Sequence, residues 1–215
     1  YMDEDLAIIT ENTRKEKIKN LFIKHKKKIY FLISAILLTI LSIFIYLDNV
    51  KKQKAKIADK FIEASVSYDE KKEAYYFKKF NEIINTNDST YAPLALFFLI
   101  DNKILNSNEE INRLFDMVLN NADLEKEIKN LVIYKKALIN ADFQSENIMI
   151  EILKPVINSE SFWKPHSLLL LGDYFLSKGE KQKAKNFYSE ILTSQKVNES
   201  IFNQAQLRIQ SNYGE

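Results

Sequence analysis

The stretch LLLLGDYFLSKGEKQKAKNFYSEIL, residues 168–192, holds two of the three glycines in a chain of 215 residues. Gly172 and Gly179 stand in a run whose apolar residues otherwise have helical spacing. A glycine within a helix costs stability, which predicts a compensating role such as the close approach of a second helix. A glycine at the end of a helix predicts a residue with positive φ. The stretch therefore predicts a helical hairpin, with Gly172 in its first helix and Gly179 at its turn.

The order of the other residues in this hairpin follows a repeat pattern. A tetratricopeptide repeat has Leu-Gly-x-x-Tyr in its first helix, a glycine at the turn and Ala-x-x-x-Phe in its second helix. In the predicted hairpin, Gly172 and Ala184 let the two helix backbones approach closely, and two aromatic rings fill the space around the crossing. An unrelated helical hairpin is the alternative. The residues that match the pattern are Leu171, Gly172, Phe175, Gly179, Ala184 and Tyr188.

The composition of the whole chain favours an all-α fold. Three glycines and three prolines provide few turn residues for a sheet protein. The lack of cysteine in the sequence excludes disulfides, thiolate metal sites and cysteine nucleophiles. The chain is long enough for one domain of about 150 residues together with an additional segment.

Residues 48–215 have the pattern of successive helices joined by short polar breaks. Ser107 and Glu110 form a capping-box pattern ahead of one apolar run, which predicts a helix start. Helices of about 13–15 residues with breaks of about 3–5 residues have the spacing of stacked antiparallel helix pairs. Because one pair cannot bury both of its faces, we expect a tetratricopeptide-like α-solenoid of about four helix pairs. The predicted helices are 48–70, 71–85, 91–105, 107–119, 123–141, 145–157, the two helices of the 168–192 hairpin, and 199–211.

Nineteen consecutive residues, 29–47, carry no charge. A helix of this length, at ~1.5 Å per residue, matches the ~30 Å hydrocarbon core of a bilayer. Tyr30 and Tyr46 lie at its two ends, where aromatic rings favour the headgroup level. We therefore expect a single transmembrane helix that continues outward into 48–70. A buried core helix and a cleaved signal peptide are the alternatives, but the run has no polar face and no small-residue cleavage site follows it.

Basic residues are concentrated before this apolar run. Residues 1–28 hold eight Lys and Arg against five Asp and Glu, whereas residues 48–215 hold 23 against 24. Eight basic residues precede the run and five follow it closely, which favours a cytoplasmic N-terminus. We therefore expect a cytoplasmic basic leader at 1–28, a transmembrane helix at 29–47 and an external domain at 48–215. A nucleic-acid binder would carry its basic excess on the folded domain, so no nucleic-acid partner is expected.

The leader allows two interpretations. Ile18, Leu21 and Phe22 have helical spacing among lysines. This pattern predicts a short amphipathic helix on the cytoplasmic surface of the membrane. A solvated, irregular tail fits the same residues.

Three stretches carry a family resemblance: EKIKNLFIKHKKKI at 16–29, TYAPLALFFL at 90–99, and the run from Trp163 through the hairpin. These stretches and the layout of the chain resemble the YfgM-type proteins, which are ancillary subunits of the SecYEG translocon. In that run Gly172 and Asp173, the sequence LSKG at 176–179, and Ala184 stand where the family has a small-acidic pair, LSKG and alanine. Residues 100–160 resemble the family only in their periodicity.

The resemblance implies a non-enzymatic protein of the bacterial inner membrane, with one span, a cytoplasmic N-terminus and a periplasmic tetratricopeptide-like domain. Its implied partners are a SecYEG-type translocon, a membrane-anchored periplasmic chaperone of the prolyl-isomerase type, and emerging client polypeptides, in addition to the lipid bilayer. The alternative is a bitopic scaffold for another envelope complex, such as division or respiratory machinery. A fold alone does not separate these functions.

The sequence predicts no catalytic, cofactor or metal site. His25 and His166 are the two histidines, one in the basic leader and one at the start of a helix, so no histidine pair is predicted to bind a metal. The sequence GEKQK at 179–183 lacks the second glycine and the Gly-Lys-Ser/Thr ending of a phosphate loop. Glu109 and Glu110 stand near an expected helix start, where they favour the helix dipole.

Four aromatic residues gather on the predicted helix 71–85: Tyr75, Tyr76, Phe77 and Phe80. Core packing is one interpretation, but a single helix rarely buries four rings. Any ring left outside the core predicts a partner-facing patch, so the four are candidate partner-facing residues. Trp163, just before Pro165, is predicted to pack at the start of the last repeat.

Overall fold

The computed structural model describes the backbone of residues 2–194 and 197–214, and the side chains of residues 23–194 and 197–214. Throughout these residues the chain is helical and contains no strand, so the predicted all-α class is confirmed. The predicted amphipathic residues Ile18, Leu21 and Phe22 have side chains outside the described set. The helices are α1 (Met2–Val66), the 3₁₀ helix η1 (Glu70–Lys72), α2 (Glu73–Ile84), α3 (Tyr91–Asp101), α4 (Asn108–Asn121), α5 (Lys126–Asn140), α6 (Glu146–Ile157), α7 (Lys164–Ser177), α8 (Lys181–Thr193) and α9 (Glu199–Tyr213).

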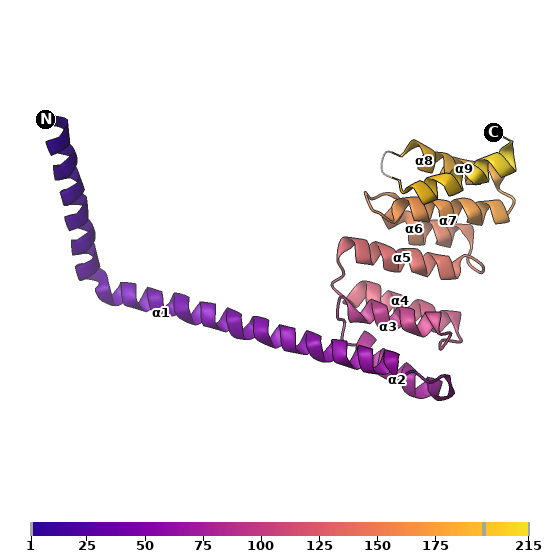
Figure 1. The fold of residues 1–215 in the computed structure, drawn as a ribbon, viewed down its shortest axis with the longest axis horizontal. Helices are drawn as coiled ribbons and strands as arrows, with labels where there is room; N and C mark the ends of the chain where they lie inside the picture. The colour runs from indigo at the N-terminus through magenta and orange to yellow at the C-terminus, as the bar shows by residue number, and fades with distance from the viewer. Residues whose placement is uncertain (1, 195–196, 215) are drawn as a thin grey trace. The chain divides into compact units, whose positions relative to one another are not determined.

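The chain divides into two compact units, Tyr1–Lys56 and Ile57–Glu215. The first unit is the greater part of α1, and the second contains the last turns of α1 with α2 to α9 (Figure 1). This division falls later than the domain start predicted at residue 48. The reason is that residues 48–56 continue the helix of the apolar run with every side chain exposed. The prediction that the apolar helix continues beyond residue 47 is therefore confirmed.

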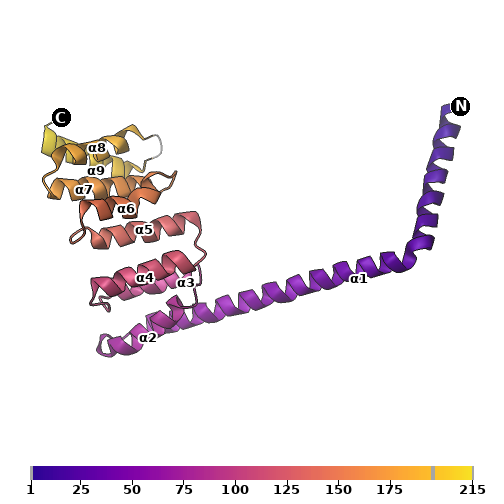
Figure 2. The same ribbon diagram turned by 180° about the vertical axis from the view of Figure 1, so that it is seen from behind.

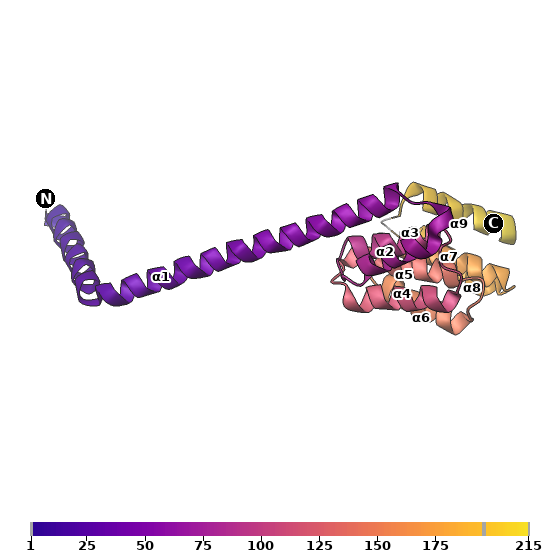
Figure 3. The ribbon, with the colours of Figure 1, turned by 90° about the horizontal axis from the view of Figure 1, so that it is seen from below.

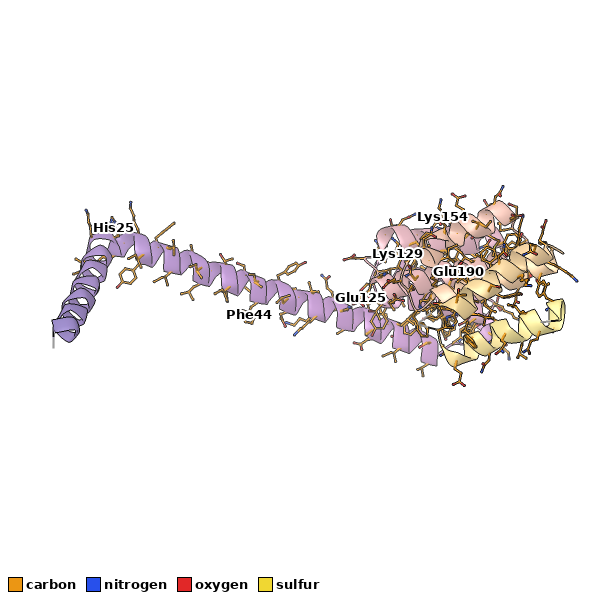
Figure 4. All side chains as sticks on the ribbon, turned by 90° about the horizontal axis from the view of Figure 1, so that it is seen from above. His25, Phe44, Glu125, Lys129, Lys154 and Glu190 are labelled. Atoms are coloured by element: carbon orange, nitrogen blue, oxygen red, sulfur yellow. The ribbon has the colours of Figure 1, made fainter. Side chains whose placement is uncertain are left out.

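One helical segment of the described residues, Ile23–Val66, is long and apolar enough to cross a membrane, and its most apolar window has a mean hydropathy of 2.5. None of that window is buried, so the segment is not a core helix in this fold. Phe44, whose side chain is labelled in Figure 4, is 68% exposed. Two hydroxyl side chains of the segment are satisfied within the helix, because Thr39 donates to the Ala35 carbonyl at 2.9 Å and Ser42 to the Leu38 carbonyl at 2.8 Å. The segment is a candidate membrane span.

The helices of the second unit form two layers. Figure 3 shows α3, α5, α7 and α9 on one side of the unit and α4, α6 and α8 on the other. Each of the helices from α2 to α9 contacts the next along the chain, and α7 also contacts both α5 and α9. The same order is visible from behind in Figure 2. Alternate helices therefore lie together in one layer.

Two hydrophobic cores meet on α5. The first core extends from the last turns of α1 to Val132, and the second extends from Ile133 and Ala137 to α9. Val132 and Ala137 are fully buried. A part-buried polar contact also joins α5 to α4, because Asn140 of α5 and Asn112 of α4 exchange amide hydrogen bonds of 2.8 and 3.0 Å. The single helix α5 therefore contributes to both cores, and its position is fixed by packing on both sides.

The turn between α7 and α8 depends on Gly179, whose φ is 80°. Its N–H donates to the Leu176 carbonyl at 3.0 Å, and the Glu180 N–H donates to the Phe175 carbonyl at 2.9 Å. These two bonds form a Schellman motif, which needs a left-handed residue at this position. The positive φ predicted for Gly179 is confirmed.

A second turn of the same kind follows α3, but without a glycine. Lys103 has a φ of 55°, its N–H donates to the Ile100 carbonyl at 2.9 Å, and the Ile104 N–H donates to the Leu99 carbonyl at 2.9 Å. The helix start predicted from Ser107 and Glu110 is confirmed in the following helix, since the Ser107 hydroxyl oxygen accepts from the Glu110 N–H at 3.4 Å. In the turn after α3, Lys103 therefore occupies a left-handed position that glycine fills more readily.

Substitution at this turn gives the first prediction. Lys103→Gly should raise the free energy of unfolding by up to about 1 kcal/mol, because it removes the steric cost of a left-handed side chain. Lys78→Gly, at an exposed position inside α2, is the matched control and should lower it by about 1 kcal/mol. Urea unfolding of the full chain in detergent micelles measures both. Shifts of the same sign in the two variants would contradict the strain at Lys103.

Candidate functional site

The layer of alternate helices presents one surface, which we call the odd-helix face. On α7, the residues of this face recur at helical spacing, and the opposite side of α7 is buried against the second core. Three cross-helix contacts connect it, one between each neighbouring pair of helices from α3 to α9. The face consists of Phe97 and Asp101 from α3, Tyr134, Lys135 and Leu138 from α5, Phe162, Trp163, His166, Leu170 and Asp173 at the start of α7 and along it, and Arg208 from α9.

Aromatic rings occupy the middle of this face. Tyr134 stacks on Trp163 with ring centroids 5.4 Å apart, and Trp163 lies 5.1 Å from the His166 ring. Phe162 contacts Trp163 at 5.5 Å and His166 at 5.2 Å, yet remains 60% exposed. We call these four residues the aromatic cluster. Exposed rings already held by neighbouring rings lose little conformational freedom on binding, which favours them as contact residues for a partner.

Hydrogen bonds hold the segment before α7 against the start of α5. One carboxylate oxygen of Glu127 accepts from the Ser161 hydroxyl at 2.8 Å and from the Phe162 N–H at 3.1 Å. The Lys126 ammonium donates to the Glu160 carbonyl at 3.0 Å. An open hollow of about 580 Å³ adjoins Phe162, and its other lining residues are Ser159, Glu160, Ser161, Lys164, Pro165 and Ser194. Phe162 is therefore positioned by its backbone as well as by its ring.

Trp163 and His166 link the cluster to the start of α7. Trp163 is the N-cap residue of α7 and Pro165 lies in the first turn, as expected for a residue that packs where the last hairpin begins. Burial lowers the pKa of His166 below 6.5, while a backbone hydrogen bond with Phe162 acts in the opposite direction. Since the folded-state pKa lies below its ordinary value, the imidazole is neutral at pH 7 and packs as an aromatic ring.

Ion pairs flank the aromatic cluster on both sides. Between α3 and α5, the Lys135 ammonium lies 3.7 Å from Asp101 and 4.6 Å from the centre of the Phe97 ring. Between α7 and α9, the Arg208 guanidinium binds both oxygens of Asp173, at 2.9 and 3.3 Å. The charges of each pair are therefore compensated by one another.

The residues of the repeat pattern explain how Asp173 is held. Leu171, Phe175, Ala184 and Tyr188 are buried in the second core. A Cβ atom placed on Gly172 would lie 2.3 Å from the Tyr188 ring, so the space left by the missing side chain is filled by that ring. The Tyr188 hydroxyl then donates to Asp173 at 2.7 Å. Burial first, and then this hydrogen bond, raise the pKa of the Tyr188 phenol, so it stays a donor.

The four candidate partner-facing rings of α2 separate in the structure. Phe80 is fully buried, where it stacks on Phe98 at 4.3 Å, and Tyr76 is 5% exposed. The partner-facing interpretation is therefore corrected for these two residues, because α2 packs them against α3 and the end of α1. Phe77 is half-buried against the same core. Tyr75 is the exposed ring, at 52%, and it lies outside the odd-helix face.

Sequence reasoning did not select most of the odd-helix face. Tyr134, Phe162 and Leu138 stand in ordinary amphipathic patterns, and the two ion pairs join residues on different helices. The sequence does offer one indication of this face, which is Asp173. It directly follows Gly172, so its carboxylate lies beside the contact between Gly172 and the Tyr188 ring. Among the described residues, no group of three or more His, Cys, Asp or Glu side chains is placed to hold a metal ion.

Comparisons of the chain with protein-family models, with curated proteins and with solved structures find no match.

The contact at Gly172 gives the second prediction. Gly172→Ala should lower the free energy of unfolding by about 1–3 kcal/mol, because the new methyl group overlaps a buried ring that cannot move freely. Ser177→Ala, at an exposed position on the same helix, should change it by less than about 0.5 kcal/mol. Thermal unfolding of the full chain measures both. The double variant Gly172→Ala/Tyr188→Val should lose less stability than the sum of the two single variants, because removing the ring removes the overlap. Additive losses would contradict a direct contact.

The lowered pKa of His166 gives the third prediction. Between the folded-state pKa and the unfolded value, the unfolded chain binds more protons. The stability that His166 contributes is therefore complete above about pH 6.5 and is lost as the pH falls through the folded-state pKa. The wild-type chain should lose more stability between about pH 7 and pH 5 than the His166→Gln variant, as measured by urea unfolding at each pH. Equal losses in the two chains would show that the imidazole is not desolvated.

Proposed function

We propose that this chain is a non-enzymatic, membrane-anchored interaction module whose odd-helix face binds polypeptide segments of partner proteins. The observation that supports this most is the aromatic cluster, in which the exposed Phe162 ring contacts Trp163 and His166 at the start of α7, and Trp163 stacks on Tyr134 of α5. Compensated ion pairs flank it, as polar residues surround the apolar centre of a protein interface. The face is suited to binding, since its charged groups pair with one another.

The proposal includes a tetratricopeptide-like solenoid. The support is the repeat pattern from Leu171 to Tyr188, the Schellman turn at Gly179, and the similar turn at Lys103. The helix pairs would be the end of α1 with α2, then α3 with α4, α5 with α6, and α7 with α8, followed by α9. A solenoid of this kind binds extended segments along the face made by its alternate helices.

The candidate span is proposed to act as a tether. A module anchored in a bilayer meets membrane-bound partners at a much higher effective concentration than a free module does. Weak contacts at the odd-helix face would then suffice for specific association. The lysine and arginine bias before the span supports a cytoplasmic N-terminus and a second unit on the outer side of the membrane.

We further propose the partners that the sequence resemblance implies, with the chain in a bacterial inner membrane. These are a SecYEG-type translocon, a membrane-anchored periplasmic chaperone of the prolyl-isomerase type, and client polypeptides that emerge from the translocon. The support comes from the leader, from the stretch 90–99 and from the run between Trp163 and residue 192. Client polypeptides in an extended state expose apolar side chains, which is the chemistry that the aromatic cluster fits.

Photo-crosslinking in living cells tests this function and is the fourth prediction. A photoreactive residue in place of Phe162, at the centre of the odd-helix face, should capture the chaperone or client chains. The same residue in place of Lys154, an exposed position on α6 that is labelled in Figure 4, is the matched control and should capture several-fold less of them. Mass spectrometry identifies the products. Capture of division or respiratory subunits alone would replace the translocon proposal with an envelope scaffold, and equal capture at both positions would reject the odd-helix face.

A further inference from the structure

A ring of lysines precedes the candidate span. Lys24, Lys26, Lys27 and Lys28 are exposed and stand within five consecutive residues of α1. None of their ammonium groups has a carboxylate partner among the described residues. The sequence itself contains no Asp or Glu between residues 17 and 47, so no acidic neighbour along the chain compensates these charges. Uncompensated charges of one sign this close together repel one another unless anions surround them.

The positions of these lysines around the helix limit what can surround them. Each residue advances an α-helix by about 100°, so Lys24, Lys27 and Lys28 share one side of the helix and Lys26 lies on the opposite side. Lys24, Lys27 and Lys28 have i, i+3 and i+4 spacing, so a protein partner docked on their side of the helix would leave Lys26 without an anion. A lipid leaflet encloses a spanning helix on every side. Positive charge on both sides of the helix therefore fits a lipid environment better than a partner docked on one side.

The other end of the apolar run is different. Lys52 forms an ion pair with Asp48 at 2.7 Å, directly after the run. The same segment after the run also contains Lys51, Lys54 and Lys56, together with the acidic Asp59. The basic residues on this side are therefore more widely spaced and partly compensated. The two ends of the candidate span present unequal positive charge to the two membrane surfaces.

We infer that the lysine ring, Lys24 with Lys26 to Lys28, binds the headgroups of anionic phospholipids in the leaflet where the candidate span begins. Lysine side chains reach the headgroup level from the end of a spanning helix with their methylene stems along the apolar surface. Tyr30, which is 63% exposed, lies one helical turn from the ring and fits the same interfacial level. This inference rests on the part of the proposed function that places the span in a bilayer. The inference adds which class of lipid the chain binds and in which leaflet it does so.

The fifth prediction tests this binding with the full chain reconstituted in phosphatidylcholine vesicles. The probes are spin-labelled phosphatidylglycerol and spin-labelled phosphatidylcholine, present in both leaflets so that the orientation of the chain does not matter. Electron paramagnetic resonance measures the motionally restricted fraction of each label. The wild-type chain should restrict the anionic label with an association constant on the order of five-fold higher than the neutral one, as about one lysine per headgroup provides.

Matched variants assign that preference to one end of the span. K24Q/K26Q/K27Q/K28Q should lose it, and K51Q/K52Q/K54Q/K56Q, which removes the same charge from the other end, should keep most of it. Salt at about 1 M should abolish the preference in the wild-type chain, because it screens charges beyond about 3 Å. Soluble glycerol phosphate at the concentration of the labelled lipid should not compete, which separates a lipid headgroup from a free phosphate.

The results separate this inference from the proposed anchor. A chain that does not float with the vesicles on a density gradient would reject the anchor, and the lipid binding with it. A chain that floats but restricts both labels equally would reject lipid binding alone. An equal loss of preference in the two quadruple variants would also reject it, since the ring would then be no different from the opposite end.

Discussion

The burial of α5 between two cores is the constraint on which the rest of the second unit depends. Four consecutive residues of this helix point in four directions, because each step turns the chain by about 100°. Val132 enters the first core, Ile133 enters the second, Tyr134 stacks on Trp163, and Lys135 reaches Asp101. A change in the rotation of α5 would disturb all four contacts together. The packing of the core and the layout of the odd-helix face are thus determined by the same rotation.

A second constraint connects the interior of the last hairpin to its surface. Gly172 leaves room for the Tyr188 ring, the Tyr188 hydroxyl reaches Asp173, and Asp173 binds Arg208 of the following helix. The pattern glycine thereby acts on α9, a helix that lies outside the hairpin. A paired Asp173 also differs from a free one, since its carboxylate already accepts three hydrogen bonds from Tyr188 and Arg208, out of about four that a carboxylate can accept. The hairpin consequently contributes to the odd-helix face through rigidity, and the aromatic cluster contributes the contact surface.

Features determined by local sequence could be predicted, and features determined by packing could not. The candidate span, the helix start at Ser107 and the turn at Gly179 follow from the residue types at those positions. The turn at Lys103 has the same geometry but was not predicted, because lysine gives no local sign of a left-handed conformation. The placement of Tyr134 on Trp163 joins residues that are distant in sequence, and helical spacing alone does not say which helices become neighbours.

The two units obey different physical rules, and this has a consequence for function. In the second unit most apolar side chains are buried together, and a substitution there acts on the fold. In the candidate span the apolar side chains are exposed all around the helix, so the fold of the chain places little restriction on their identity. What remains specific in the first unit is charge, since Lys24 to Lys28 are uncompensated while Lys52 is paired. Recognition of the membrane would then reside in the electrostatics at the ends of the span, and recognition of proteins in the odd-helix face.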